Sequence, residues 1–319
     1  MRASGALAPL AAAALLVACS GDAERTPSPA PNPPPVSGAE VTPTPSPVPP
    51  PEFDAASAER TVRDLAGRIG PREATSAAFR RAAAQVADRL RAMGYTVTMP
   101  EFRVPAGNSW GVDVPAGTTR NVVATPPDLA PDAEHVVVGA HLDTVPQAPG
   151  AEDNASGVAV LLELARMAAA APDALRRPVV FVAFGAEEPR GPGDDRHHYG
   201  SREYVADLTE AQRETITGMV SLDRVGVGTV VPVCNGGAGT PAVARELRSA
   251  ARAAGVPVRD CGSNRSSDHW SFEKARIPAA RLGSTPYAGY HSAQDRPAVV
   301  ARAQLDRVGR LMWAWLTGD

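Results

Sequence analysis

The sequence has little excess charge of either sign, few aromatic side chains and few cysteines. Its 319 residues include 32 basic and 35 acidic side chains. This balance leaves no basic stripe to bind phosphates, so we expect no nucleic-acid partner. Aromatic residues make up 5% of the chain, whereas alanine, arginine and proline are abundant. That bias indicates the base composition of the coding sequence rather than a function.

The N-terminal apolar run is short. It extends from Ala6 to Ala18 after the basic Arg2, too few residues to span a membrane as a mature helix. The run ends in the letters LVAC and resembles the signal of a bacterial lipoprotein, which implies removal of residues 1–18 and lipidation of Cys19. Several acyl chains on Cys19 would give stable membrane binding. We therefore expect an exported protein, lipid-anchored at the cell envelope of a bacterium; an ordinary secretory signal is the alternative.

The segment that follows is rich in proline, serine and threonine. Residues 19–52 include "TPSPAPNPPPVSG", a composition that cannot build a core and is typical of an extended spacer. Residues 53–319 contain no second linker. We interpret them as one folded domain, which we expect to be a monomer.

Two cysteines remain once Cys19 is assigned to lipid. Cys234 and Cys261 each lie near the end of a strand-like run, "TVVPVC" and "VPVRDC". An even number of cysteines in an oxidising compartment favours pairing. We predict a disulfide between them, with two unpaired buried thiols as the alternative.

The domain alternates helical and strand patterns. Apolar residues recur with a helical period in residues 57–69, 76–94, 156–171, 240–255 and 301–316. Strand patterns occupy residues 95–104, 120–127, 134–141, 176–188, 216–226, 229–234 and 277–284. Continuous apolar strands interleaved with helices predict an α/β fold, a three-layer α/β/α sandwich around a mainly parallel, mixed sheet.

Polar residues follow three consecutive core strands. "VVVGA" is followed by His141, "VVFVAFGA" by Glu187 and Glu188, and "MVSL" by Asp223. Function in such sheets collects at the carboxyl ends of the strands. One acid in such a place is commonplace, but three such strands are hard to explain as solvated loops, so we expect a metal site at this edge.

The spacing around these residues suggests individual roles. Asp143 lies two residues after His141, on the same side of an extended chain, where a carboxylate can fix the imidazole for metal binding. Adjacent residues at a strand end point in opposite directions, so one of Glu187 and Glu188 can bind metal while the other serves as a base. A single histidine in such a place is more often structural.

The acids between the first two of these strands have competing interpretations. Asp153 precedes a helix and could be an ordinary N-cap, although the neighbouring Asn154 would make it redundant in that role. Glu152 is interpreted as an ordinary loop residue.

Six short blocks occur in a characteristic order: "GAHLDT", "EDNASG", "GAEE", "SLDRVG", "SSDHWSF" and "YHSAQD". Together they resemble the bacterial leucyl-aminopeptidase family of dizinc exopeptidases, the aminopeptidase Y type, over nearly all of residues 60–318. The resemblance implies that residues 53–319 are a zinc exopeptidase domain. It also implies two Zn²⁺ ions, peptide substrates and removal of their N-terminal residues.

The resemblance also implies a set of metal ligands. His141 and Asp223 would bind one zinc ion, Glu188 and His291 the other, and Asp153 would bridge the two.

Three further residues take catalytic roles by the same resemblance. Glu187 would be the general base, Tyr290 would stabilise the tetrahedral intermediate, and Asp143 would support His141. Two zinc ions sharing a water lower its pKa and polarise the scissile carbonyl.

The chain departs from the family pattern after Glu188. Residues 189–199 are longer than the corresponding family segment and are predicted to lie on the rim of the site. His197 and His198 could line a specificity pocket, but we favour a flexible exposed loop. Arg265 receives no role, and His269 is interpreted as structural or substrate-adjacent.

Other functions remain as alternatives. A carboxypeptidase, a dipeptidase or a glutaminyl cyclase could use the same scaffold. A non-catalytic binding lipoprotein would be missing some of the metal ligands, and none of them is missing here. Residues 107–111 fit G-x-S-x-G, a serine-nucleophile pattern, but that motif needs a helix next and none is predicted there.

Overall fold

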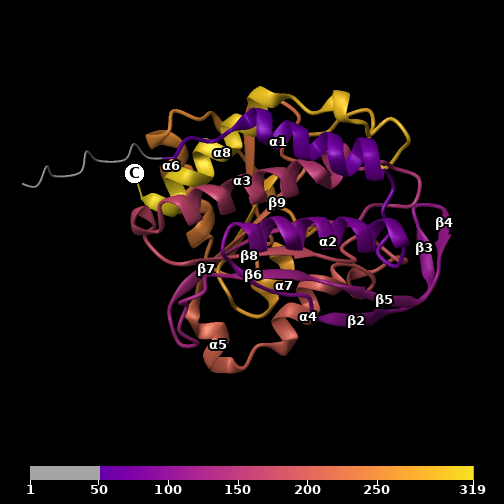
Figure 1. Ribbon diagram of the computed structural model, residues 1–319, viewed down its shortest axis with the longest axis horizontal. Helices are drawn as coiled ribbons and strands as arrows, with labels where there is room; N and C mark the ends of the chain where they lie inside the picture. The colour runs from indigo at the N-terminus through magenta and orange to yellow at the C-terminus, as the bar shows by residue number, and fades with distance from the viewer. Residues whose placement is uncertain (1–50, 319) are drawn as a thin grey trace, which may run out of the picture. The chain divides into compact units, whose positions relative to one another are not determined.

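A mixed sheet of eight strands forms the centre of the computed structural model, which describes residues 51–318 (Figure 1). The signal, Cys19 and nearly all of the predicted spacer lie outside the described residues. In spatial order the strands are β1 (Thr96–Thr98), β6 (Val122–Thr125), β8 (Val179–Phe184), β7 (His135–His141), β9 (Ile216–Asp223), β12 (Ala279–Gly283), β10 (Val231–Asn235) and β11 (Val258–Ser263).

The middle of this sheet is parallel. Strands β8, β7, β9 and β12 run parallel to one another, and β10 pairs in parallel with β11. Strands β1 and β6 add antiparallel pairs at one side, and β10 is antiparallel to β12. The parallel centre aligns the carboxyl ends of β7, β8 and β9, which is where the predicted site residues follow.

The two faces of β7 show why the strand is apolar between its terminal histidines. Val136, Val138 and Ala140 belong to the large core cluster on one face, whereas Val137 belongs to the smaller cluster on the other. Successive side chains of a strand point to opposite faces. A strand covered on both faces therefore needs apolar residues at consecutive positions.

Helices cover both faces of the sheet, as Figure 1 shows. The large core cluster lies under α1 (Ala55–Val62), α2 (Ala77–Ala92), α3 (Ser156–Ala170), α6 (Ala242–Ala253) and α8 (Arg302–Thr317). The other face carries α4 (Tyr199–Asp207), α5 (Glu210–Thr215) and α7 (His269–Lys274). The predicted α/β/α sandwich is confirmed.

Several elements differ from the prediction. The helix predicted over residues 57–69 is α1 followed by a π-helical segment, Arg63–Ile69. The short helices α4, α5 and α7 were not predicted, because six to nine residues show too little periodicity.

The strand predicted over residues 95–104 is divided between the main sheet and a smaller one. Pro100 lies in the break, and β2 (Glu101–Val104) then pairs with β5 (Gly117–Arg120). Between these two strands lies a second hairpin, β3 (Gly107–Ser109) and β4 (Val112–Val114). Residues 107–111 are thus a strand and the hairpin turn that follows it, with no helix, as expected for a chance G-x-S-x-G match.

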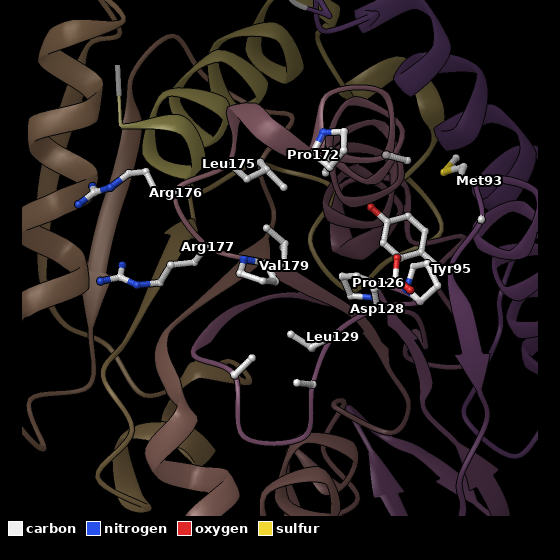
Figure 2. Close-up of a pocket in the computed structure, with 17 residues that line it drawn as sticks. Met93, Tyr95, Pro126, Asp128, Leu129, Pro172, Leu175, Arg176, Arg177 and Val179 are labelled. Atoms are coloured by element: carbon white, nitrogen blue, oxygen red, sulfur yellow. The ribbon is translucent and has the colours of Figure 1, made fainter.

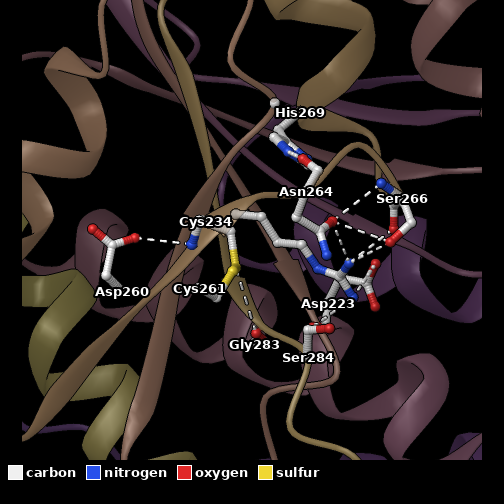
Figure 3. Close-up of a disulfide and its surroundings, with 12 residues drawn as sticks. Asp223, Cys234, Asp260, Cys261, Asn264, Ser266, His269, Gly283 and Ser284 are labelled. Carbon is white, nitrogen blue, oxygen red and sulfur yellow. Dashed lines mark hydrogen bonds and ion pairs between the residues drawn. A yellow bond between two sulfur atoms is a disulfide. The ribbon is translucent and has the colours of Figure 1, made fainter.

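A disulfide joins Cys234 and Cys261, as predicted (Figure 3). It links β10 to the edge strand β11 across a separation of 27 residues. The bond therefore fixes the outermost strand of the sheet.

A hollow of about 580 Å³ lies near the start of β8 (Figure 2). Its lining includes Tyr95, Leu129, Pro172, Arg176 and Val179. Val179 opens β8, so this hollow is at the amino end of the strand and contains none of the predicted site residues.

Candidate metal centre

The predicted site residues meet at the carboxyl ends of three strands. His141 is the last residue of β7, Asp223 is the last residue of β9, and Glu187 and Glu188 follow shortly after β8. All four side chains are buried, with less than a tenth of each exposed. Four titratable groups thus share one water-poor location.

The carboxylate of Asp153 lies at the centre of this group. Its Oδ1 is 3.0 Å from Nε2 of His141, and its Oδ2 is 3.1 Å from Nε2 of His291. The two imidazoles therefore approach different oxygens of one carboxylate. Asp153 lies in the turn before α3, and its peptide bond to Asn154 is cis.

A second carboxylate faces each imidazole. Oδ1 of Asp223 is 3.7 Å from Nε2 of His141, and Oε2 of Glu188 is 3.4 Å from Nε2 of His291. His141, Asp153 and Glu188 offer ligand atoms within 4.8 Å of one another, and so do His141, Glu187 and Asp223. The structure brings together all five residues predicted as ligands.

Burial and neighbouring charges shift the pKa values of this cluster in opposite directions. Burial opposes ionisation of Asp153, but its contacts with His141 and His291 outweigh this and hold the pKa of Asp153 well below its ordinary value. Burial and the charge of Asp153 raise the pKa of Glu188 well above its ordinary value. The cluster concentrates more negative charge than its histidines neutralise.

Among the five predicted ligands, two buried carboxylate oxygens have no hydrogen-bond partner in the described part of the chain. They are Oε1 of Glu188 and Oδ1 of Asp223, on the two sides of Asp153. An unpaired buried carboxylate oxygen is costly, and coordination of a divalent cation removes that cost. The donor set of imidazole and carboxylate groups is one that zinc accepts, so the residues present fit zinc.

Asp143 acts differently from what we expected. The ring Nδ1–H of His141 faces the backbone carbonyl of Asp143 at 3.2 Å, whereas the carboxylate oxygen is 3.8 Å away. The carboxylate instead accepts the backbone N–H groups of Glu187 at 3.0 Å and Glu188 at 3.2 Å. Asp143 therefore orients His141 through its backbone and fixes the Glu187–Glu188 turn through its side chain.

Glu152 is not an ordinary loop residue, and this interpretation was wrong. Its side chain is fully buried and accepts the backbone N–H groups of Gly226 at 2.8 Å and Val227 at 3.1 Å. Burial raises its pKa well above the ordinary value. It ties the turn that carries Asp153 to the loop after β9. No motif in its own vicinity reveals this long-range role.

Asp295 supports the same turn and was also missed. Its two carboxylate oxygens accept the backbone N–H groups of Glu152 at 2.8 Å and Asp153 at 3.1 Å. The residue closes the block "YHSAQD", so the motif contained the signal although no role was assigned to it.

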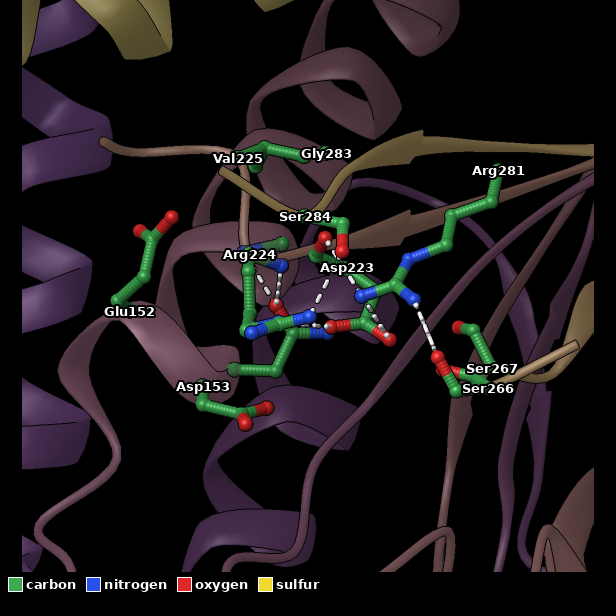
Figure 4. Close-up of polar contacts among 12 residues, drawn as sticks. Glu152, Asp153, Asp223, Arg224, Val225, Ser266, Ser267, Arg281, Gly283 and Ser284 are labelled. Atoms are coloured by element: carbon green, nitrogen blue, oxygen red, sulfur yellow. Dashed lines mark hydrogen bonds and ion pairs between the residues drawn. The ribbon is translucent and has the colours of Figure 1, made fainter. Parts of the chain in front are cut away.

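A buried arginine faces the other side of Asp223. Nη2 of Arg281, on β12, is 3.1 Å from Oδ2 of Asp223, and both side chains are buried (Figure 4). Burial opposes ionisation of Asp223, but Arg281 and His141 outweigh it and lower the pKa of Asp223. A charged residue inside the apolar run "IPAARLG" was the available signal.

Arg72 supports the loop between β7 and Asp153. It is fully buried and donates to the backbone carbonyls of Leu142, Pro149 and Gly150 at 2.6, 2.7 and 2.9 Å. Sequence reasoning did not identify this residue, since its partners lie about seventy residues further along the chain.

We expected residues 189–199, the insertion after Glu188, to be a flexible exposed loop, but His198 in this segment is buried. Its side chain is 3% exposed, and its Nε2 lies 3.2 Å from Oε1 of Glu187. Burial lowers the pKa of His198 to about 4, so the ring is neutral. Asp194 of the same segment accepts from Nε1 of Trp270 and pairs with Lys274, which fastens the insertion to α7.

The remaining residues singled out from the sequence are peripheral or structural. His269 is buried and its Nε2 lies 2.8 Å from the carbonyl of Asn264, in agreement with a structural role. Arg265 lies over the ring of Trp270. Asp268, which directly precedes His269, was not singled out from the sequence. It is fully buried, and burial together with the charge of Glu187 raises its pKa to about 7.

Tyr290 lies at the mouth of the cluster. Its ring stacks on that of His291 with centroids 3.7 Å apart, and the guanidinium of Arg224 lies over it at 4.3 Å. The side chain is 39% exposed, so it can contact a ligand entering the site.

Residues 121–316 match the family model of Peptidase family M28, so the chain belongs to this family. It is 30% identical over 210 residues to aminopeptidase YwaD of Bacillus subtilis, which covers 62% of this chain and 44% of that protein. It is 27% identical over 223 residues to leupeptin-inactivating enzyme 1 of Streptomyces exfoliatus, covering 69% and 44%. The chain thus spans less than half the length of these two relatives.

Solved structures share the fold. BSAP, a zinc aminopeptidase from Bacillus subtilis, superposes with a TM-score of 0.72 at 21% identity, over 82% of this chain and 94% of that chain. The glutaminyl cyclase of Porphyromonas gingivalis superposes with a TM-score of 0.71 at 25% identity, over 83% and 98%. Among residues 51–318, none of the helices has the length and apolar character needed to cross a membrane.

Proposed function

We propose that this member of Peptidase family M28 is a dizinc aminopeptidase that removes N-terminal residues from peptides. The observation that carries the proposal is the position of Asp153. Its two carboxylate oxygens approach Nε2 of His141 and Nε2 of His291 at 3.0 and 3.1 Å. A carboxylate held between two imidazoles is the arrangement that a bridging ligand requires.

The remaining ligands divide into two halves around Asp153. His141 and Asp223 would hold one zinc ion, and Glu188 and His291 would hold the other. The contact of the His141 Nδ1–H with a backbone carbonyl supports this assignment, because it leaves Nε2 free as the ligand atom. When bound, the two ions would polarise the scissile carbonyl and lower the pKa of a shared water.

Glu187 is proposed as the general base. Its carboxylate lies within 4.0 Å of His141 and is held by a turn that Asp143 fixes through two backbone N–H groups. It would accept a proton from the attacking water as the new C–O bond forms. It would return that proton to the amine nitrogen as the C–N bond breaks, which leaves a free amino acid and a shortened peptide.

His198 is proposed to position this base. The neutral ring lies against one side of the Glu187 carboxylate, with its Nε2 3.2 Å from Oε1. A buried neighbour restricts the rotamers of the carboxylate and excludes water from that side. Tyr290, beside His291, is proposed to stabilise the tetrahedral intermediate.

A substrate panel tests the proposed activity. We expect the purified protein to hydrolyse aminoacyl anilides and to leave the same anilides intact when their amino groups are acetylated. Glu187→Gln should lower kcat by roughly 10²–10⁴-fold, the usual contribution of a general base, while zinc content stays unchanged. Hydrolysis of blocked substrates, or full activity of Glu187→Gln with zinc bound, would overturn the proposal.

A glutaminyl cyclase is the second candidate. The similarity to the Porphyromonas gingivalis enzyme favours it, at 25% identity and a TM-score of 0.71. Peptides with N-terminal glutamine separate the two functions: an aminopeptidase releases free glutamine, whereas a cyclase releases ammonia and leaves a blocked peptide.

We also propose that Cys19 carries a lipid that anchors the enzyme at the cell envelope. The chain is 42% identical over 89 residues to the probable lipoprotein aminopeptidase LpqL of Mycobacterium tuberculosis, which supports this proposal. Labelling with a fatty-acid analogue in a bacterial host should mark the wild-type protein and not Cys19→Ser. Equal labelling of both would contradict it.

A further inference from the structure

A hairpin outside the family-matched region reaches the mouth of the site. The hairpin β3–β4 precedes residues 121–316, and Figure 1 shows it at the right-hand edge of the folded domain. Trp110 occupies its tip. The indole ring lies with its centroid 4.4 Å from that of His291 and 5.9 Å from that of Tyr290, in edge-to-face arrangements.

The tip of the hairpin presents this tryptophan to solvent. Ser109 pairs with Val112, so Trp110 and Gly111 form a two-residue turn, with φ of 49° and 88°. Such turns favour asparagine, aspartate and glycine, and a bulky residue with positive φ is uncommon. The ring is nevertheless 56% exposed, which gives it little packing to offset that conformation.

The insertion after Glu188 fixes the base of the hairpin. The buried side chain of Arg190 donates to the carbonyls of Pro105 and Pro115, which flank the hairpin, and pairs with Glu73 at 2.7 Å. A Cβ at Gly107 would lie 1.9 Å from the carbonyl oxygen of Arg190, so only glycine permits this approach.

The tip is held as well. The side-chain amide of Gln147, from the loop after β7, donates to the carbonyl of Trp110 at 3.3 Å. The hairpin is therefore held at its base by the insertion after Glu188 and at its tip by the loop after β7. These contacts keep Trp110 beside the metal cluster.

Exposed apolar surface is concentrated here. Among residues 51–318, the large hydrophobic side chains that are exposed are Trp110, Val112 and Tyr290. Two of them are in ring contact beside His291, and the third is on the same hairpin. The pair of exposed aromatic rings, Trp110 and Tyr290, lies next to a polar centre, which is typical of a ligand-binding surface.

The position of the base decides which part of a peptide meets this surface. The leaving amine must approach Glu187, which contacts His141 and His198. Trp110 and Tyr290 lie instead at His291, on the other side of Asp153. The substrate residue on the amino side of the scissile bond therefore faces the two rings.

We propose that Trp110, together with Tyr290, binds the apolar side chain of the substrate's N-terminal residue and so determines specificity; this inference rests on the proposed aminopeptidase function. The faces and edges of the two rings provide a large apolar area with little conformational freedom to lose. Glycine has no side chain to bury there. Leucyl and phenylalanyl substrates should therefore be preferred over glycyl ones.

Selectivity between aminoacyl anilides tests the proposal. We expect Trp110→Ala to lower the ratio of kcat/KM for leucyl over glycyl anilide by roughly 10-fold, since apolar contacts in a pocket discriminate by about 10–200-fold. The loss should fall mainly on KM, and Trp110→Phe should restore most of the ratio. Val112→Ala removes apolar surface from the same hairpin, leaves the three rings in place and should keep the ratio.

A binding measurement provides a readout independent of turnover. The fluorescence of Trp110 is the part of the wild-type signal that Trp110→Phe lacks. Quenching of this part by acrylamide should decrease when leucinamide is added and not when glycinamide is added. An unchanged leucyl-to-glycyl ratio in Trp110→Ala would overturn the assignment. So would a series of leucyl dipeptides in which the activity lost in Trp110→Ala depends on the second residue, after the scissile bond. Failure of the wild type to hydrolyse any aminoacyl anilide would instead contradict the proposed function.

Discussion

The two halves of the candidate metal centre are built differently. His141 and Asp223 end buried strands, and each has a second partner, the Asp143 carbonyl and the Arg281 guanidinium. Glu188 and His291 lie in loops, and among the described residues Oε1 of Glu188 and Nδ1 of His291 have no hydrogen-bond partner. In the same part of the chain Asp223 also has one unpaired oxygen, Oδ1, but its other oxygen is held by Arg281.

This difference has a consequence for metal affinity. Groups that orient a ligand contribute about 10–100-fold to metal affinity or activity. The strand-borne half has such groups for both ligands, whereas the loop-borne half depends on the Asp295 and Asp143 contacts to neighbouring backbone. We therefore expect the strand-borne half to bind zinc more tightly.

The largest effect is expected where the halves meet. Asp153→Asn keeps the size of the side chain but removes the charge that both imidazoles face. Lewis-acid catalysis is worth several kcal/mol, so kcat/KM should fall on the order of a thousandfold. Kinetics and metal analysis on the same preparation check this, and retention of zinc and activity would disprove the bridge.

Removing Arg281 should lower the zinc affinity of the strand-borne half toward that of the loop-borne half. Arg281→Met leaves Asp223 without its buried partner, which should weaken zinc binding roughly 10–100-fold and destabilise the fold by about 3–5 kcal/mol. Metal titration and urea unfolding measure the two effects. Arg310→Met, which breaks an exposed pair with Asp306, is the matched control and should cost at most about 1 kcal/mol. Equal effects of the two variants would contradict the role of Arg281.

Chelation should separate the halves without mutation. As a chelator is added to the zinc enzyme, the loop-borne ion should leave first, at roughly tenfold lower chelator concentration than the second. Two steps in zinc content measured after dialysis are expected. Loss of both ions in a single step would indicate equal affinities and remove the basis of the comparison.

The smallest effect on the site is expected from the disulfide. Replacing Cys234 and Cys261 by serine should lower the free energy of unfolding by about 3–4 kcal/mol for a closed loop of this length. The bond fixes an edge strand, so activity at low temperature should remain close to wild type. A large loss of activity in folded protein would show that β10 and β11 influence the metal cluster.

The strand-borne half was predictable because its signals are local. His141 and Asp223 each follow a continuous apolar run, and so does the proposed base Glu187. The rule that polar residues gather at the carboxyl ends of parallel strands brings them together. The loop-borne ligand His291 could be assigned only through the family resemblance, because nothing in its own vicinity predicts a contact with Asp153.

The support of the site was not predictable for a related reason. Glu152, His198 and Trp110 were interpreted as loop residues or not singled out, yet each contacts a residue of another loop or turn of the site, Gly226, Glu187 and His291 respectively. Such contacts depend on how loops pack, and loops lack the periodicity that identifies helices and strands. Arg281 did leave a signal, since a charge in an apolar strand needs a partner.

The zinc content of the purified protein tests the central claim most directly. After saturation with zinc and removal of excess metal, elemental analysis of the wild type should give about two zinc ions per chain, and Asp153→Asn should bind fewer. One zinc ion or none in an active, folded wild-type preparation would contradict the dinuclear centre bridged by Asp153.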